Sequence, residues 1–216
     1  MEVTTQTVGL PQLNKPAPAF DAITTHGRKT LEDYKGKWLI LFSHPADFTP
    51  VCTTEFIGFQ ERKDQFDAMN CELLGLSIDS HHSHNAWTLN IKEKFGVEIQ
   101  FPIIADLDMK VAMSYGMIHE AAADTSAVRA TFIIDPEGIL RAMVYYPMSN
   151  GRQIDEFVRL LKAMQTSDSN ACATPENWRE GEKVIVPPPA TIDEARARLE
   201  SNEYECTDFY FCKKSL

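Results

Sequence analysis

The sequence lacks three features that would place it in other classes of protein. In its 216 residues no apolar run approaches the roughly 20 residues needed to cross a bilayer. It has no basic cluster, and its formal charge is −10, which argues against nucleic acid or an anionic membrane as a partner. The first residues, MEVTTQTVGLPQ, have neither a basic nor an apolar signal region. We therefore expect a cytoplasmic protein with no membrane or nucleic-acid partner.

The chain has few cysteines, and their number is odd. An odd number without a secretory signal does not indicate a disulfide framework, and disulfides in a reducing compartment tend to be transient and catalytic. No two cysteines show the C-x-x-C spacing of a thioredoxin-like disulfide oxidoreductase. The question is therefore which cysteines can react among the five present, Cys52, Cys71, Cys172, Cys206 and Cys212.

The chain up to about residue 165 alternates patterns typical of strands and helices. Proline and glycine mark a hairpin turn at 136–138, and Gly96 marks the end of a helix. This order predicts an α/β domain with a mixed sheet. The expected elements are strands at 37–44 and 71–79, helices at 52–69 and 83–95, a hairpin at 129–146 and a helix at 154–164.

The composition changes after Gln165. Residues 166–178 are polar and typical of a linker, residues 191–200 fit a short helix, and the tail is aromatic with two cysteines. We therefore expect two domains, an α/β domain over residues 1–167 and a C-terminal extension over residues 168–216.

Cys52 stands at the expected start of a helix, where unpaired N–H groups and the helix dipole favour a thiolate. A cysteine with an ordinary pKa of about 8.5 is only ~3% ionised at pH 7, and lowering that pKa to about 6 takes roughly 3.4 kcal/mol. The helix end supplies roughly 0.3–2 kcal/mol, and a charge-assisted hydrogen bond adds roughly 1.5–3 kcal/mol. An arginine beside Cys52 is therefore expected, with Thr49 as a hydroxyl partner.

The string HPADFTPVCTTE, residues 44–55, resembles the active-site motif of the peroxiredoxins. That motif is a proline, three residues, a threonine, two residues and a cysteine, and Pro45, Thr49 and Cys52 fill it. Three further segments resemble the one-cysteine subfamily: DTSAVRATFIIDP, YYPMSNGR and NWREGEKVIVPPP. The resemblance therefore covers essentially the whole chain.

The resemblance implies a thiol peroxidase with no cofactor and no metal. Cys52 would attack the peroxide, Thr49 would help to orient the thiolate and the peroxide oxygens, and Pro45 would shield the pocket. Arg129 would be the expected arginine beside the sulfur. The substrates would be hydrogen peroxide and organic hydroperoxides, and Cys52 would become a sulfenic acid.

The same resemblance implies three supporting residues and an assembly. His44 matches a histidine beside the reactive sulfur, Arg152 matches a second arginine near the pocket, and Glu55 belongs to the polar network that holds the arginines. The implied fold is thioredoxin-like, with a C-terminal extension that packs against a partner subunit. The implied assembly is a homodimer that forms a decamer.

The tail departs from the plain one-cysteine pattern, because Cys206 and Cys212 are spaced C-x₅-C. Some microbial members of the subfamily look similar, and there the last tail cysteine attacks the sulfenic acid. We therefore expect Cys212 of a neighbouring subunit to resolve Cys52, Cys206 to be auxiliary, and a thioredoxin-type dithiol protein to be the reductant. In the alternative reading, both thiols only lie on an aromatic docking surface.

Three interpretations remain for the other signals. His81, His82 and His84 are interpreted as a solvated helix start, because their spacing is poor for a metal site on a helix. Cys71 is interpreted as an inert core thiol, and nothing near Cys172 indicates activation.

The competing function is a holdase or redox sensor that uses the Cys52 thiol, and such a protein would consume peroxide slowly.

Overall fold

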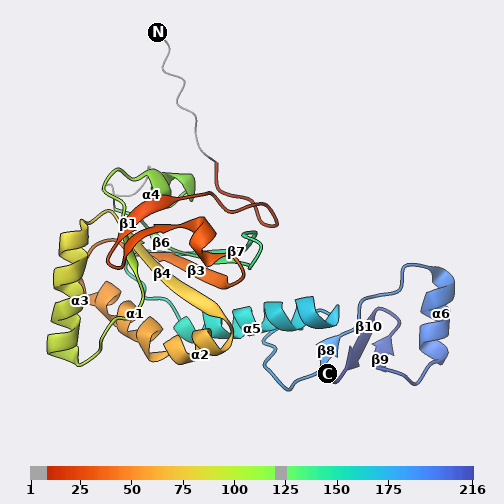
Figure 1. Ribbon diagram of the computed structural model, residues 1–216. Coiled ribbons are helices and arrows are strands. Elements are labelled where there is room, and N and C mark those ends of the chain that lie inside the picture. Colours follow the sequence, from red (N-terminus) through yellow and green to blue (C-terminus); the bar gives the residue numbers. More distant parts are fainter. Residues whose placement is uncertain (1–8, 120–125) are drawn as a thin grey trace, which may run out of the picture. The chain divides into compact units, whose positions relative to one another are not determined.

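The computed structural model describes residues 9–119 and 126–216, and the chain divides into two compact units at residues 154 and 155 (Figure 1). The elements of the first unit are β1 (Asp21–Thr24), β2 (Gly27–Thr30), the 3₁₀ helix η1 (Leu31–Tyr34), β3 (Trp38–Ser43), α1 (Pro50–Glu61), α2 (Lys63–Ala68), β4 (Cys71–Ser77), α3 (His81–Phe95), β5 (Ile103–Ala105), α4 (Lys110–Ser114), β6 (Arg129–Ile134) and β7 (Leu140–Tyr146). The remaining elements are α5 (Ile154–Asn170), β8 (Val184–Ile185), α6 (Ile192–Glu200), β9 (Glu205–Asp208) and β10 (Phe211–Lys214).

The first unit is built on a seven-stranded sheet with the order β2-β1-β5-β4-β3-β6-β7. β3 and β4 are parallel, as are β4 and β5, whereas β3 and β6 are antiparallel. β3 lies between β4 and β6, and all six of its residues are buried, which explains why it reads as a continuous apolar run. The expected α/β fold with a mixed sheet is confirmed.

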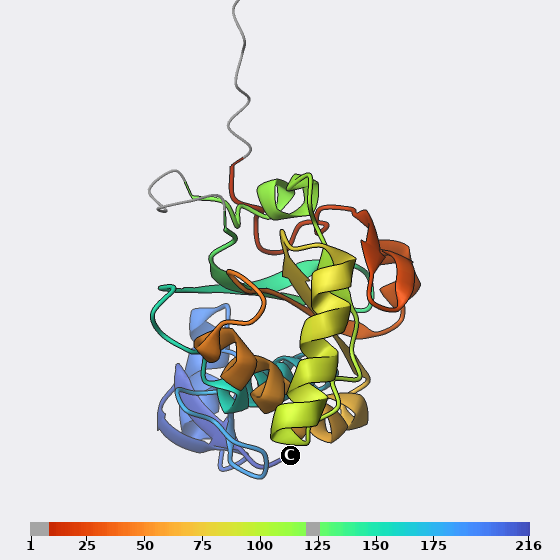
Figure 2. The same cartoon turned by 90° about the vertical axis from the view of Figure 1, so that its left-hand side faces the viewer.

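Helices cover both faces of this sheet, and side chains of β3 alternate between them. Leu39 and Leu41 belong to the core cluster that includes Val111 and Ala112 of α4. On the opposite face, the ring of Phe42 stacks on Phe59 of α1 with centroids 4.0 Å apart. Figures 1 and 2 show α1 and α3 together on one side and α4 on the other. The loop from β3 to α1 therefore starts at the centre of the sheet.

The ends of α3 follow from local chemistry. The Ser80 hydroxyl accepts a hydrogen bond from the backbone N–H of Ser83 at 3.2 Å, and Gly96 ends the helix with a left-handed φ of 74°, a conformation that glycine adopts without strain.

The single helix expected over 52–69 is wrong in one respect. Arg62, with φ −107° and ψ 6°, separates α1 from α2, because its N–H bonds to Phe59 in a tighter turn.

The expected hairpin is confirmed as β6 and β7, which pair along their length. The carboxylate of Asp135 accepts hydrogen bonds from the backbone N–H groups of Glu137 and Ile139, and Gly138 has a left-handed φ of 83°. The β1–β2 hairpin was not predicted. Its strands have four residues each and are largely exposed, so they carry little apolar periodicity.

In the second unit, α5 extends to Asn170, so the interpretation of residues 166–170 as a linker is wrong. The side-chain amide of Asn170 donates to the carbonyl of Thr166 at 2.9 Å, and Ala171 ends the helix with a left-handed φ of 46°. The expected domain junction at 167 and 168 therefore falls within a helix. α6 forms as expected, with Thr191 and Glu194 as a capping box.

The tail of the second unit is a three-stranded sheet with the order β8-β10-β9. Cys206 and Cys212 face each other across the β9–β10 hairpin, and a disulfide bond joins them. Among the described residues, no helix combines the length and the apolar character that a membrane crossing requires.

Candidate active site

Cys52 is the third residue of α1, and its side chain is fully buried. Thr49 has extended backbone angles immediately before the helix, and Pro50 is the first helical residue, a position where its missing N–H costs nothing. The N–H of Cys52 is thus among the groups that a helix start leaves without a helical acceptor. An anion at this sulfur would therefore be stabilised by the start of the helix.

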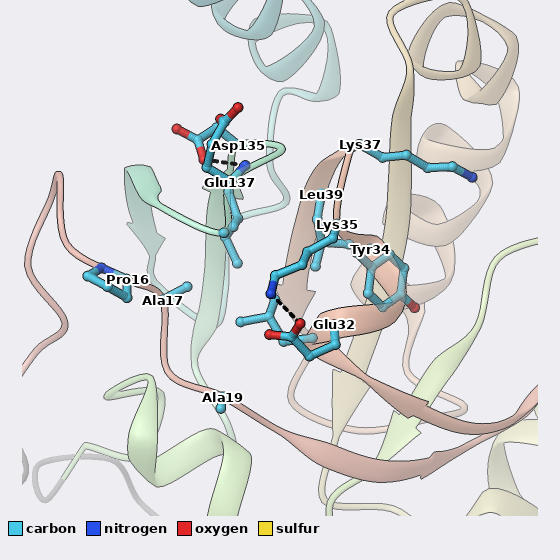
Figure 3. Close-up of a pocket in the computed structure, with 13 residues that line it drawn as sticks. Pro16, Ala17, Ala19, Glu32, Tyr34, Lys35, Lys37, Leu39, Asp135 and Glu137 are labelled. Carbon is cyan, nitrogen blue, oxygen red and sulfur yellow. Dashed lines mark hydrogen bonds and ion pairs between the residues drawn. The ribbon is translucent and has the colours of Figure 1, made fainter.

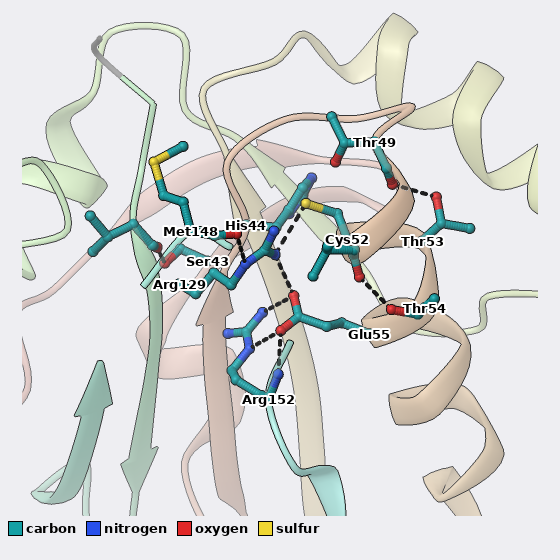
Figure 4. Close-up of polar contacts among 12 residues, drawn as sticks. Ser43, His44, Thr49, Cys52, Thr53, Thr54, Glu55, Arg129, Met148 and Arg152 are labelled. Carbon is teal, nitrogen blue, oxygen red and sulfur yellow. Dashed lines mark hydrogen bonds and ion pairs between the residues drawn. The ribbon is translucent and has the colours of Figure 1, made fainter. Parts of the chain in front are cut away.

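Arg129, the first residue of β6, lies beside this sulfur. Its Nη1 is 3.3 Å from the Sγ of Cys52, and its Nε donates to the carbonyl of Met148 at 2.9 Å. The structure therefore places an arginine where the sequence predicts one (Figure 4). A guanidinium at this distance favours a negatively charged sulfur.

Glu55 lies one helical turn after Cys52 on α1 and hydrogen-bonds to two arginines. Its Oε2 accepts hydrogen bonds from Arg129 Nη1 at 2.7 Å and from Arg152 Nη2 at 2.9 Å. Its Oε1 accepts from the backbone N–H and the Nε of Arg152 at 2.8 and 2.9 Å. All three side chains are buried. One carboxylate between two guanidinium groups leaves one positive charge, which a Cys52 thiolate would neutralise.

The surroundings of Glu55 keep it ionised and fix Arg152. Burial acts to raise the pKa of the Glu55 carboxyl, but the hydrogen bonds and charges of Arg152 and Arg129 outweigh burial and lower that pKa. The guanidinium of Arg152 lies 5.3 Å from the ring of Phe42 and 5.7 Å from that of Phe59. It also donates to the carbonyl of Ala130 at 2.9 Å. The charge pattern beside Cys52 is therefore held rigidly.

Three residues of the predicted motif lie in the loop between β3 and α1. Pro45 is buried, and Thr49 is half-buried. The Thr49 hydroxyl donates to the carbonyl of Ala46 at 2.9 Å, so its oxygen remains available as an acceptor rather than a donor. His44 is fully buried, and its ring packs 4.8 Å from that of Phe56, one helical turn after Cys52.

His84 is not part of a solvated helix start, and that interpretation is wrong for this residue. The side chain is fully buried, because α3 packs its first turn against the β3–α1 loop and β5. His84 Nδ1 lies 2.8 Å from Asp47 Oδ2, and His84 Nε2 lies 3.1 Å from the carbonyl of Ile104. His44 Nε2 also contacts Asp47, at 2.9 Å from Oδ1. Asp47 therefore bridges two buried imidazoles.

Sequence reasoning missed this network. The available signal was the acidic residue of the motif itself, Asp47, two positions after Pro45. His44, Asp47 and His84 bring three possible metal ligands within 4.8 Å of one another. Because Asp47 already bonds to both imidazoles, through His44 Nε2 and His84 Nδ1, and His84 Nε2 bonds to the carbonyl of Ile104, we interpret the cluster as a hydrogen-bond network. The absence of a metal remains a prediction.

The other cysteines have different surroundings. Cys71 is buried at the start of β4, and burial raises the pKa of its thiol, as suits an inert core residue. Cys172 is a half-buried free thiol. Cys206 is half-buried and Cys212 is buried, and they are bonded to each other rather than present as free thiols.

A pocket with a volume of about 260 Å³ lies elsewhere in the first unit (Figure 3). It contains no cysteine and shares no residue with the cluster around Cys52, so we assign it no part in thiol chemistry. Its lining residues are Pro16, Ala17, Ala19, Leu31, Glu32, Tyr34, Lys35, Lys37, Leu39, Ile134, Asp135, Glu137 and Gly138.

Two family models match the chain. The AhpC/TSA family model matches residues 13–143, and the model of the C-terminal domain of 1-Cys peroxiredoxin matches residues 163–202. A peroxiredoxin of Aquifex aeolicus is 54% identical over 98% of this chain and 100% of its own length. A peroxiredoxin of Archaeoglobus fulgidus is 51% identical over 95% of this chain and 99% of its own length.

Solved structures agree with these relatives. A yeast mitochondrial 1-Cys peroxiredoxin superposes with a TM-score of 0.85 at 37% identity, covering 96% of this chain and 100% of that one. A peroxiredoxin 6 of Arenicola marina, a cysteine-to-serine mutant, has a TM-score of 0.84 at 30% identity and covers 95% and 98%. The expected thioredoxin-like fold with a C-terminal extension is confirmed. The chain therefore belongs to the AhpC/TSA family, and it is a peroxiredoxin, a thiol peroxidase, that carries the C-terminal domain of the one-cysteine members.

Proposed function

We propose that the Cys52 thiolate reduces hydrogen peroxide and organic hydroperoxides. The sulfur attacks the hydroxyl oxygen of the peroxide in line with the O–O bond, so that an S–O bond forms as the O–O bond breaks. The sulfur is oxidised to a sulfenic acid and the peroxide is reduced. The leaving oxygen takes up a proton from solvent and departs as water or an alcohol.

The observation that carries this proposal is the contact between Arg129 Nη1 and the sulfur at 3.3 Å. Glu55 and Arg152 leave one uncompensated positive charge in a buried cluster, and a thiolate balances it. Donors held in place before the reaction also stabilise charge as it develops on the peroxide oxygens. Arg129 thus activates the nucleophile and assists the leaving oxygen.

The motif residues take supporting roles in this proposal. Thr49 orients the peroxide: its own hydroxyl hydrogen is directed to Ala46, so its oxygen can accept the hydrogen on the leaving oxygen of hydrogen peroxide. Pro45 shields the pocket from water. His44 lines the buried side of the site, and Arg152 acts through Glu55.

We further propose that the sulfenic acid is resolved by Cys212 of a neighbouring subunit. The Cys212 thiol condenses with the sulfenic acid, which forms a disulfide and releases water. Cys206 then attacks Cys212 by thiol–disulfide exchange, which frees the Cys52 thiolate. The bond between Cys206 and Cys212 supports this sequence, because it is the product of the exchange. A thioredoxin-type dithiol reduces that bond and completes the cycle.

The remaining assignments belong to the same proposal. The protein acts in the cytoplasm as a homodimer that assembles into a decamer, with residues 1–167 as the peroxidase domain and 168–216 as the extension. The C-terminal domain match at residues 163–202 supports an extension of this kind. A thiol resolving mechanism via glutathione and thioredoxin systems is described for the yeast relative, which supports a thiol reductant here.

Stopped-flow measurement of peroxide loss tests the proposed chemistry. The full chain is compared with Cys52→Ser and with Cys71→Ser, a matched buried cysteine outside the site. We expect the first substitution to abolish rapid peroxide loss and the second to leave it unchanged. Equal rates in the parent and Cys52→Ser would overturn the proposal, and slow, substoichiometric loss in the parent would favour a holdase or redox sensor.

A further inference from the structure

His84 has a hydrogen-bond acceptor at each ring nitrogen. Nδ1 faces the Asp47 carboxylate at 2.8 Å, and Nε2 faces the backbone carbonyl of Ile104 at 3.1 Å. A carboxylate and a carbonyl only accept hydrogen bonds, so both nitrogens must carry hydrogen for both contacts to form. Burial acts to raise the pKa of Asp47, but the hydrogen bonds of His44 and His84 outweigh it and lower that pKa. His84 and Asp47 therefore form a buried hydrogen-bonded pair in which both ring nitrogens of His84 act as donors.

This pair determines the state of His44. The Nε2 of His44 lies 2.9 Å from Asp47 Oδ1, so Nε2 carries the hydrogen. Burial lowers the pKa of His44, against the effect of Asp47 and the nearby carboxylate of Asp79. A lowered pKa favours the neutral ring, in which Nδ1 carries no hydrogen and presents its lone pair. Within residues 9–119 and 126–216, Nδ1 is buried without a hydrogen-bond partner.

The His44 ring lies in the wall of the Cys52 site. It packs on Phe56 of α1 and 5.1 Å from Trp87, whose Nε1 donates to the hydroxyl of Thr53, the neighbour of Cys52. The preceding residue, Ser43, accepts a hydrogen bond from the backbone N–H of Ala130, next to Arg129. Figure 4 shows the His44 ring and the Arg129 guanidinium on the same side of α1 as the Cys52 sulfur.

We propose that His84 is a positioning residue for the Cys52 reaction, and that it acts through Asp47 to hold His44 with Nδ1 as the acceptor for the peroxide hydrogen. This inference rests on the proposed function and deepens it. Arg129 supplies hydrogens at the sulfur, whereas a hydroperoxide also brings a hydrogen that needs an acceptor. That hydrogen stays on the transferred oxygen and becomes the S–O–H hydrogen, so Nδ1 serves both states and no proton leaves.

Two substitutions of His84 separate this role from simple packing. His84→Asn keeps a donor at the position of Nδ1, toward Asp47, whereas His84→Gln keeps one at the position of Nε2, toward Ile104. Gln is closer to histidine in volume, so a packing role favours Gln. We expect His84→Asn to retain the parent rate of peroxide consumption within about threefold, and His84→Gln to lose roughly tenfold to a hundredfold, as for other partners that orient a functional histidine. The exposed neighbour His82→Gln is the matched control on the same helix.

A double-mutant cycle with His44→Phe tests whether His84 acts through His44. We expect His84→Gln to cause no further loss in the His44→Phe background. Equal rates for His84→Asn and His84→Gln, a higher rate for Gln, or losses that multiply in the double variant would overturn the inference. Where a His84 variant does not fold by circular dichroism, Asp47→Asn takes its place in the same cycle, with the same expected loss and the same criterion.

Cys52→Ser, measured beside every variant, distinguishes the two levels of proposal. If peroxide consumption does not depend on Cys52, both the proposed function and this inference fail. If it depends on Cys52 but not on the His84 substitutions, only the role of His84 fails.

Discussion

Glu55 holds Arg129 at the Cys52 sulfur. The carboxylate accepts a 2.7 Å hydrogen bond from Nη1 of Arg129, and the same nitrogen lies 3.3 Å from the Cys52 sulfur. One nitrogen thus contacts both the structural anion and the proposed nucleophile. Because Glu55 also binds Arg152 through both oxygens, the position of Arg129 depends on a network that spans α1 and β6.

Replacing Arg129 with lysine should slow peroxide consumption while the charge is kept. A lysine is a point charge and does not supply the planar fork of donors that reaches Glu55, Met148 and the sulfur together. Loss of one pre-positioned donor typically costs about 10²–10³ in rate, and we expect a loss of that size. Stopped-flow assays measure it, with Arg141→Lys on β7 as the control. A rate within twofold of the parent would contradict this role of Arg129.

Replacing Glu55 with glutamine should destabilise the protein and slow its consumption of peroxide. The substitution leaves two buried arginines without their carboxylate, and breaking a buried ion pair in this way costs roughly 3–5 kcal/mol. Urea unfolding of Glu55→Gln should show that loss, and peroxide assays on folded protein should show a reduced rate. Glu61→Gln, at the exposed end of the same helix, should change neither. Unchanged stability in Glu55→Gln would show that the network does not contribute to the stability of the folded protein.

The stability of the protein should fall in acid, in part because of Glu55. The folded state lowers the pKa of this carboxyl below its ordinary value of 4.5. A group of this kind contributes stability that is fully present above its pKa in the unfolded chain and is lost as pH falls toward its pKa in the folded state. Unfolding free energies measured from pH 7 down to acid should therefore fall below about pH 4.5, and less steeply in Glu55→Gln. Parallel curves would exclude Glu55 as a contributor.

Adding a methyl group at Gly75 should disturb the support of α1. A Cβ at this position of β4 would lie 3.0 Å from Phe56 Cζ, so the ring one turn after Cys52 would have to move. Overpacking of a buried core costs roughly 1–3 kcal/mol, and we expect that loss of stability with a slower peroxidase. In Gly151→Ala the new Cβ would meet Val51 at 3.4 Å, an ordinary contact, so this control should resemble the parent. Thermal unfolding and stopped-flow assays compare the two variants.

The two tail cysteines should give different products when either is replaced. One equivalent of peroxide should convert Cys206→Ser into a disulfide-linked dimer joined through Cys52 and Cys212, because exchange with Cys206 is removed. Cys212→Ser should give no such dimer and should accumulate the sulfenic acid. Non-reducing electrophoresis with disulfide mapping measures both products. A Cys52-linked dimer in Cys212→Ser at the level seen in Cys206→Ser would show that Cys212 is not the resolving residue.

Much of the first unit could be predicted because its signals are local. The apolar run of β3, Gly96 after α3 and the turn at residues 136–138 act through neighbours within a few positions of the chain. The motif from Pro45 to Cys52 likewise places the cysteine at a helix start. Where local signals are weak, as in the short, exposed strands β1 and β2, the prediction failed.

The sequence alone determined that Cys52 lies at the start of a helix and that a cationic partner was needed, because both follow from local order and from the energy of ionising a thiol. Only the tertiary structure decided which groups meet there. Arg129 is 77 positions from Cys52, and Arg152 is 97 positions from Glu55. The pairing of β3 with β6 and β4 and the packing of α3 bring these side chains together, and they bury His84 against Asp47. Such contacts depend on how whole elements pair and pack, and the local periodicity of a sequence carries no information about that pairing and packing.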